Sequence, residues 1–257
     1  MADSMEQMAG LAGRVAMVTG GSRGIGAATG IRLARHGALV GVGGRDVAAI
    51  EQIVDRIRAD GGRAVATPPD KTHAGALEHA FTVLAEQFGP VDLLAAFAGG
   101  NGQPQPTDQV TPARWRAVLE GDLTSTFLTI RAALPTTIEQ GRGSIVTMAS
   151  SAARQPSQAA APYAAAKAGV VMLSRHLAAE MGSRGIRVNC LARVTVLNEQ
   201  MAHVMTDEQM ARLASTFPLG HIGKPDDVAA AATFLLSDQA SWITGVTLEA
   251  AGGRTIV

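Results

Sequence analysis

Short apolar runs alternate with longer amphipathic segments along almost the whole chain. The apolar runs occupy residues 14–19, 38–44, 63–69, 91–99, 143–150, 185–192 and 245–250. Helical patterns lie between them, over residues 25–37, 46–62, 72–89, 111–139, 157–183 and 225–237. Because the strand-like runs are apolar on both faces, they are typical of a parallel sheet that helices cover on both sides.

No linker, repeat or low-complexity segment interrupts this alternation. We therefore expect a single α/β domain over residues 1–257, built on a doubly wound parallel sheet of seven strands with helices on both faces. We expect residues 1–12 to be a loose lead-in. Residues 193–217 are irregular and partly helical, and we expect them to cover the substrate as a lid. Ligands in such sheets bind beyond the carboxyl ends of the strands, so the turns there are the candidate binding site.

Charge and composition exclude several classes of function. The 22 basic and 22 acidic residues balance and form no basic stripe, so we expect no nucleic-acid partner. The single cysteine, Cys190, lies in an apolar run, and the six histidines show no metal-ligand spacing, so we expect no metal. No apolar run reaches the roughly 18 residues of a membrane span, and the amino-terminal residues resemble no signal or transit peptide. We expect a soluble cytoplasmic protein with no membrane partner.

A glycine-rich turn, TGGSRGIG at residues 19–26, follows the first predicted strand. Glycines at Gly20, Gly24 and Gly26 let a backbone approach a phosphate, and the helix amino terminus behind them favours an anion. The spacing differs from the general G-x-G-x-x-G fingerprint, and an ordinary glycine-rich loop is the alternative. The preceding strand and the following helix favour a dinucleotide site.

The turn after the second predicted strand carries arginine where NAD enzymes commonly carry an acid. Gly44 closes that strand and Arg45 follows it, while Arg23 lies in the first turn. Two converging guanidinium groups suit a ribose 2′-phosphate and predict NADPH, although both arginines could simply be solvated. Asp70, after the third strand, could accept a hydrogen bond from the adenine amine or could cap the next helix.

Tyr163 is the only tyrosine of the chain, and Lys167 follows it four residues later in PYAAAKAG. On a helix the two side chains share a face, and the small neighbours leave room for a ligand beside the ring. A nearby cation favours the ionised form of a phenol, so such a tyrosine can act as a general acid in reduction or a general base in oxidation. A surface contact is the alternative, because the pattern alone is weak.

Together these motifs resemble the short-chain dehydrogenase/reductase family, and the resemblance runs from about Leu11 to the carboxyl terminus. It rests on TGGSRGIG, on Ser150 thirteen residues before Tyr163, on the Tyr-x-x-x-Lys pair and on ITGVTLEAAGG. The closest likeness is to the ketoreductase and oxoacyl-carrier-protein-reductase branch. The resemblance implies a Rossmann-type fold, NADPH, a small-molecule carbonyl substrate and a homotetramer.

The resemblance also implies roles for particular residues. Tyr163 would donate a proton to the substrate heteroatom, Lys167 would bind the nicotinamide ribose and favour the ionised phenol, and Ser150 would hold the heteroatom. Cofactor contacts would come from the turns after the strands, at Thr19, Gly20, Ser22, Arg23, Gly24, Ile25, Gly26, Arg45, Asp70, Lys71, Ala98, Gly99, Val196 and Asn198.

Two turns depart from the family pattern. The usual Asn-Asn-Ala-Gly after the fourth strand is Ala96-Phe97-Ala98-Gly99, so the asparagine side-chain bonds are lost. The usual Pro-Gly after the sixth strand is Arg193-Val194, and Asn198 replaces a threonine. Arg193 places a cation or a long stem near the site, unless it faces solvent.

The third departure is Asp122, which stands where the family has an asparagine on the long helix. That asparagine acts through its backbone carbonyl, so Asp122 could be a silent replacement, or could be protonated and act as a second acid. A carboxylate near Lys167 would instead favour positive charge in the site. Reduction of a C=N bond needs a cationic iminium, whereas ketone reduction develops negative charge on oxygen. Asp122 therefore makes imine reduction credible.

The leading hypothesis is an NADPH-dependent reductase of a C=O or C=N bond in a small, fairly apolar substrate. Met201, Met205 and Met210 suit an adaptable pocket wall, or else pack the lid against the sheet. The alternatives are an NADPH sensor without turnover and a dehydratase or epimerase, because one fold hosts several chemistries. The Ser-Tyr-Lys set argues against a sensor, which has no need of an acid.

Overall fold

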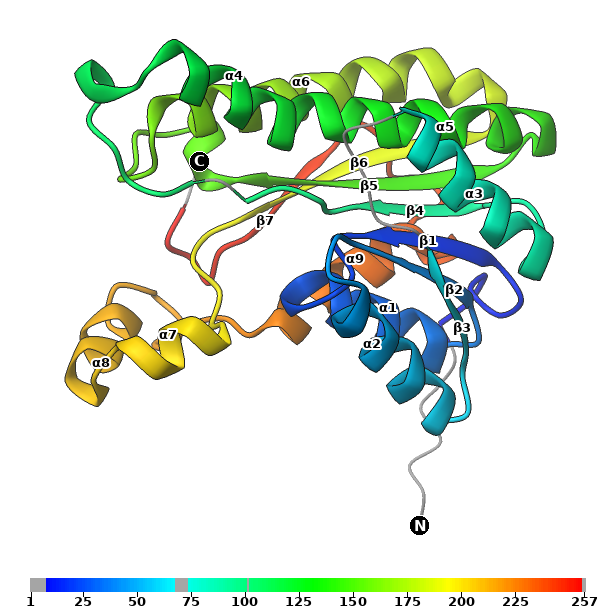
Figure 1. The fold of residues 1–257 in the computed structure, drawn as a ribbon, viewed down its shortest axis with the longest axis horizontal. Coiled ribbons are helices and arrows are strands. Elements are labelled where there is room, and N and C mark those ends of the chain that lie inside the picture. The colour runs from blue at the N-terminus through cyan, green and yellow to red at the C-terminus, as the bar shows by residue number, and fades with distance from the viewer. Residues whose placement is uncertain (1–7, 68–73, 101, 256–257) are drawn as a thin grey trace.

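All seven apolar runs form strands, and every strand pairing among the described residues is parallel. The structure is a computed structural model that describes residues 8–67, 74–100 and 102–255. The sheet has the order β3-β2-β1-β4-β5-β6-β7 (Figure 1). Its strands are β1 (Val15–Thr19), β2 (Leu39–Gly43), β3 (Arg63–Thr67), β4 (Leu93–Ala96), β5 (Gly143–Ser150), β6 (Ile186–Arg193) and β7 (Thr247–Ala250). The predicted doubly wound α/β fold is confirmed.

Helices cover both faces of the sheet (Figure 1). One layer contains α1 (Gly24–Arg35), α2 (Val47–Ala59) and α9 (Pro225–Leu236). The other contains α3 (Ala74–Phe88), α4 (Pro112–Leu119), α5 (Ser125–Gln140) and α6 (Ala161–Met181). Successive strand residues face opposite layers, so Met17 packs with the second layer and Val18 with the first. None of the helices in the described ranges has the length and apolar composition to cross a membrane.

The single helix predicted over residues 111–139 is interrupted. After α4, residues Glu120–Thr124 form a π-helical turn, and α5 begins directly behind it. Two hydroxyl groups support the widened turn: Ser125 Oγ donates to the Gly121 carbonyl (2.7 Å) and Thr126 Oγ1 to the Asp122 carbonyl (2.9 Å). Isolated π-helical turns are frequent at functional sites, and this one carries the fully buried Asp122.

The helix predicted over residues 157–183 is shorter at its amino terminus. α6 begins at Ala161, with Pro162 in its first turn, where proline is favoured because its missing N–H has no partner to lose. It ends at Met181, and one 3₁₀ turn, Gly182–Arg184, follows.

The irregular segment 193–217 contains two short helices, α7 (Glu199–Val204) and α8 (Asp207–Ala214), which stand apart from both layers (Figure 1). Phe217, which is 3% exposed, centres a small apolar cluster that Met201 and Met210 join. These two methionines therefore pack the segment internally. Both tryptophans are exposed, Trp115 by 40% and Trp242 by 99%, so neither is a core residue.

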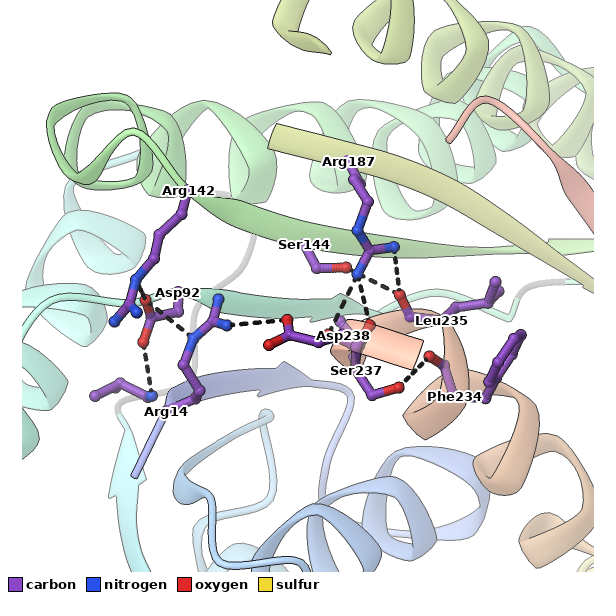
Figure 2. Close-up of polar contacts among 11 residues, drawn as sticks. Arg14, Asp92, Arg142, Ser144, Arg187, Phe234, Leu235, Ser237 and Asp238 are labelled. Carbon is purple, nitrogen blue, oxygen red and sulfur yellow. Dashed lines mark hydrogen bonds and ion pairs between the residues drawn. The ribbon is translucent and has the colours of Figure 1, made fainter. Parts of the chain in front are cut away.

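An ionic network fixes the amino ends of the strands (Figure 2). The Asp92 carboxylate accepts from the Val15 N–H (3.1 Å) and pairs with Arg14 Nε (3.2 Å) and Arg142 Nε (2.9 Å). On β6, Arg187 donates to carbonyls at the end of α9, and its burial lowers the pKa of its guanidinium. The network lies at the amino ends of the strands, and the turns that carry the predicted site lie at their carboxyl ends.

Candidate active site

A cleft of about 710 Å³ opens at the carboxyl ends of the strands. It lies where the strand order reverses, because the chain continues from β1 towards β2 on one side and β4 pairs with β1 on the other. This is the place where open α/β sheets bind their ligands. Predicted residues that line it are Thr19, Gly20, Ser22, Arg23, Ile25, Gly26, Arg45, Ala98, Gly99, Tyr163 and Lys167.

The glycine-rich turn after β1 has the geometry of a phosphate cradle. Gly20 has a φ of +69°, and a Cβ there would lie 2.9 Å from the Phe97 carbonyl oxygen. A Cβ on Gly26 would collide with the Gly20 carbonyl. Arg23, at the amino-terminal cap of α1, makes no side-chain capping bond, and the first turn of α1 has no acid. The turn and its helix N–H groups therefore fit a diphosphate.

The turn after β4 is tied to the turn after β1 through Thr19. Thr19 Oγ1 accepts from the N–H groups of Phe97 (3.2 Å) and Ala98 (3.4 Å). The Phe97 ring is partly buried and packs against the core beneath α1 and α9. Apolar packing and the threonine bonds therefore hold this turn.

Two arginines line the outer part of the cleft. Arg23 Nη2 lies 4.0 Å from Asp46 Oδ2, and its side chain is 79% exposed. Asp46 also caps α2 by accepting from the Ala49 N–H (3.1 Å). No carboxylate in the described ranges pairs with the exposed Arg45. The arrangement leaves guanidinium groups available to an anion.

Tyr163 and Lys167 lie one turn apart on α6 and face the cleft. The Lys167 ammonium lies 5.6 Å from the centre of the Tyr163 ring and donates to the Met148 carbonyl (3.0 Å). Both residues are buried, with Tyr163 5% and Lys167 3% exposed. Ser150 ends β5, and its Oγ accepts from the Ala152 N–H (3.2 Å). Ala152 packs with Tyr163, which brings the Ser150 turn beside the ring.

The Asp122 side chain contacts this centre directly. Its Oδ1 pairs with Lys167 Nζ at 3.2 Å and accepts from the Gly100 N–H at 2.6 Å. The carboxylate therefore joins the lysine to the turn after β4. The side chain, and not only the backbone carbonyl, therefore bonds across the site.

Neutral groups lie beneath the lysine. Thr147 Oγ1 and Ser174 Oγ are 2.7 Å apart and share a hydrogen bond. Burial raises the pKa of the Cys190 thiol, which Thr147 and the Lys167 charge lower in part. Cys190 is fully buried, as expected of a core cysteine. Asp122 is thus the counter-charge that the described residues supply to Lys167.

Several predicted residues do not line the cleft. Asn198 Oδ1 accepts from the Met201 N–H (2.9 Å) and so caps α7, while Val196 is buried and bridges to Gly223. Asp70 and Lys71 lie outside the described residues. Gly24, with a φ of +56°, belongs to the turn but not to the lining. No group of three or more potential metal ligands gathers within the described ranges.

Sequence reasoning did not select two further contacts. Gly100 donates to Asp122, and Met148 presents its carbonyl to Lys167. The glycine run GGNG is a signal for unusual backbone geometry, and Gly99 and Gly100 do have φ values of +136° and +121°. The Met148 contact cannot be predicted from the sequence, because every residue of a strand has a backbone carbonyl.

The fold and the cleft define a dinucleotide-binding α/β protein, and comparisons with known proteins specify the family. The family model for enoyl-(acyl carrier protein) reductase matches residues 20–255. The chain is 37% identical over 245 residues to cis-4-hydroxycyclohexanecarboxylate dehydrogenase of Sinomonas cyclohexanicum, covering 95% of this chain and 97% of that one.

One further relative and one solved structure support the same family assignment. The chain is 35% identical over 246 residues to 2,5-dichloro-2,5-cyclohexadiene-1,4-diol dehydrogenase of Sphingobium indicum, covering 96% of this chain and 98% of that one. A solved structure of a candidate gluconate dehydrogenase from Agrobacterium tumefaciens superposes with a TM-score of 0.90 at 32% identity, covering 96% of this chain and 98% of that one. The chain belongs to the short-chain dehydrogenase/reductase family, whose members are oxidoreductases that use nicotinamide cofactors.

Proposed function

We propose that the protein is an NADPH-dependent reductase acting on a C=O or C=N bond of a small, fairly apolar substrate. The observation that carries this proposal is the buried Tyr163–Lys167 pair at the wall of the dinucleotide cleft. A relative from Chlamydia pneumoniae, 32% identical over 245 residues, is a 3-oxoacyl-[acyl-carrier-protein] reductase. Steady loss of NADPH absorbance with substrate tests the proposal, and binding without loss would indicate a sensor instead. A dehydratase or epimerase would convert its substrate with no net NADPH loss.

The residues of the cleft divide the work. NADPH, when bound, supplies the hydride. The turn at residues 19–26 would hold the diphosphate, and Arg23 and Arg45 the 2′-phosphate. Lys167 would hold the nicotinamide ribose, Ser150 the substrate heteroatom, and Tyr163 would give that heteroatom its proton. The segment 193–217 would cover the bound substrate as a lid.

The phosphate proposal predicts a loss of cofactor preference in Arg45→Ala. We expect NADPH affinity to fall about 10- to 100-fold, because charge-assisted bonds to the extra phosphate are lost. NADH affinity should change less than about twofold, because it lacks that phosphate. Fluorescence titration of both cofactors measures this. Arg56→Ala, which removes an exposed arginine from the far end of α2, the helix that begins two residues after Arg45, is the matched control. Equal losses for both cofactors would count against the phosphate clamp.

The Asp122–Lys167 pair supports imine reduction. A lysine alone would leave a positive charge that repels an iminium, and the carboxylate 3.2 Å away offsets that charge. We therefore expect the protein to prefer a cyclic imine over the ketone of the same shape.

The isosteric Asp122→Asn variant tests the role of the charge. We expect its ratio of kcat/KM for imine over ketone to fall about tenfold relative to the parent, because about 1.4 kcal/mol of charge stabilisation corresponds to that factor. NADPH consumption with the matched substrate pair measures the ratio. If parent and variant favour the ketone equally, the carboxylate does not direct the chemistry and the protein is a carbonyl reductase.

We also propose a cytoplasmic homotetramer. Exposed apolar side chains lie on α4, α5 and α6 at Trp115, Phe127 and Met172, and in the segment before β7 at Trp242 and Val246. Burial of such surfaces in symmetric interfaces is the usual arrangement in closed oligomers. Light scattering coupled to size-exclusion chromatography measures the assembly, and a monomeric mass would remove this part of the proposal.

A further inference from the structure

We infer that Arg193 binds a carboxylate of the substrate, so that the preferred substrates are oxo acids or imino acids. This inference rests on the proposed reductase function and adds the substrate class. Arg193 is the last residue of β6, and its Cα pairs with Ser150 on β5 and Ala250 on β7. Its half-buried side chain lines the same cleft as Tyr163 and Lys167. The Arg193 side chain therefore lies in the part of the cleft that Tyr163 and Lys167 also line.

The charge of Arg193 is unmatched within the described part of the chain. Lys167 pairs with Asp122, Arg23 lies near Asp46, and Arg154 Nη1 pairs with Glu249 Oε1 at 3.2 Å. No such carboxylate is recorded for Arg193 in the described ranges; its Nη1 donates to the Val194 carbonyl at 3.2 Å. A guanidinium has five N–H donors, so this one bond orients the group and leaves the others for a ligand.

The acid on the neighbouring strand does not serve Arg193. Glu249 on β7 pairs in register with Ala192, whereas Arg193 pairs with Ala250. Successive residues of a strand face opposite sides of the sheet, so Glu249 and Arg193 point to different sides. Glu249 is instead engaged by Arg154, and desolvation raises the pKa of its carboxyl group. Arg193 is therefore available to pair with an anion from outside the chain.

The position of Arg193 favours a substrate anion over the phosphates of the cofactor. The phosphate cradle follows β1, and β6 is three strands away in the sheet order β1-β4-β5-β6. At about 4.8 Å per strand this is roughly 14 Å. Arg193 instead neighbours Ser150, the residue proposed to hold the reacting heteroatom. A single planar guanidinium matches one carboxylate by two parallel bonds, which favours a monocarboxylate.

Matched acids and amides test the inference. We would measure kcat/KM for 4-oxocyclohexanecarboxylate and 2-oxobutanoate and for their carboxamides, with saturating NADPH. In Arg193→Met, which keeps an unbranched apolar stem but removes the guanidinium and its charge, we expect the acid-over-amide ratio to fall about 10- to 100-fold. Arg193→Lys should retain part of the preference. Arg175→Met, an exposed arginine of α6 outside the cleft lining, should match the parent.

A binding experiment separates failure of this inference from failure of the proposed reductase. Calorimetric titration of the NADPH complex with cyclohexanecarboxylate and its carboxamide needs no turnover. Acid-selective binding that Arg193→Met abolishes supports the inference even if neither ketone is reduced. Equal binding of acid and amide by the parent, or an unchanged acid preference in Arg193→Met, would overturn it. A loss of NADPH affinity in Arg193→Met would also overturn it, because the arginine would then serve the cofactor.

Discussion

Tyr163→Phe is expected to lower kcat for NADPH-dependent reduction by about 10²- to 10⁴-fold, the range of a positioned general acid. The substitution removes one hydroxyl and keeps the ring, which packs with Val118 and Ala152. NADPH affinity should therefore stay within about twofold of the parent. Steady-state kinetics and fluorescence titration of NADPH measure the two quantities on the same preparations.

Because the chain has a single tyrosine, a label on tyrosine reports on Tyr163 alone and can serve as a control for cofactor binding. Incorporation of 3-fluorotyrosine labels Tyr163 alone, because the chain has no other phenol. Its fluorine resonance should shift when NADPH fills the cleft that the ring lines. A Tyr163→Phe protein that melts like the parent, binds NADPH and still retains most of its activity would remove Tyr163 as the proton donor.

Asp122→Ala is expected to lower the free energy of unfolding by about 3–5 kcal/mol, the usual cost of leaving one member of a buried ion pair alone. Lys167 is only 3% exposed, and the Gly100 N–H would lose its acceptor at the same time. Asp122→Asn keeps an acceptor for that N–H, so it should cost less, about 1–3 kcal/mol. Urea denaturation at one fixed protein concentration measures both, because assembly contributes to apparent stability.

The double variant Asp122→Ala/Lys167→Met distinguishes the ion pair from packing. Removal of both charges should recover part of the loss, since the buried ammonium is then absent. If Asp122→Ala alone costs less than about 1 kcal/mol, the carboxylate does not stabilise the buried lysine. If the double variant is no more stable than Asp122→Ala, the loss comes from the cavity and the Gly100 bond.

The fold followed from the sequence because parallel strands covered on both faces must be apolar throughout, and all seven such runs became strands. The start of α6 was missed by four residues, although Pro162 is a signal for a first helical turn. The π-helical turn could not be predicted. Residues Glu120–Thr124 carry no proline or other local signal, and Asp122 in this turn contacts a lysine 45 positions later.

Individual contacts of the site were harder to predict than its location. The resemblance drew attention to Asp122, but nothing local in EGDLTS states that its carboxylate reaches Lys167. Asn198 is predicted to contact the cofactor, and in the structure its side chain caps α7; the cofactor contact stays a prediction. Asparagine is among the preferred residues at helix amino-terminal caps, so the competing signal was present in the sequence.

The ionic network of Asp92, Arg14 and Arg142 stabilises the amino ends of the strands, whereas the proposed chemistry takes place at their carboxyl ends. Every departure from the family pattern, at Ala96-Phe97, Arg193-Val194, Asn198 and Asp122, lies away from these three residues. The amino ends of the strands thus form a fixed scaffold, and the segments at their carboxyl ends carry the residues that differ. The turns after β4 and β6 can therefore be diversified without touching Asp92, Arg14 or Arg142, whereas Asp122, which is bonded to Lys167 and Gly100, is also needed for stability.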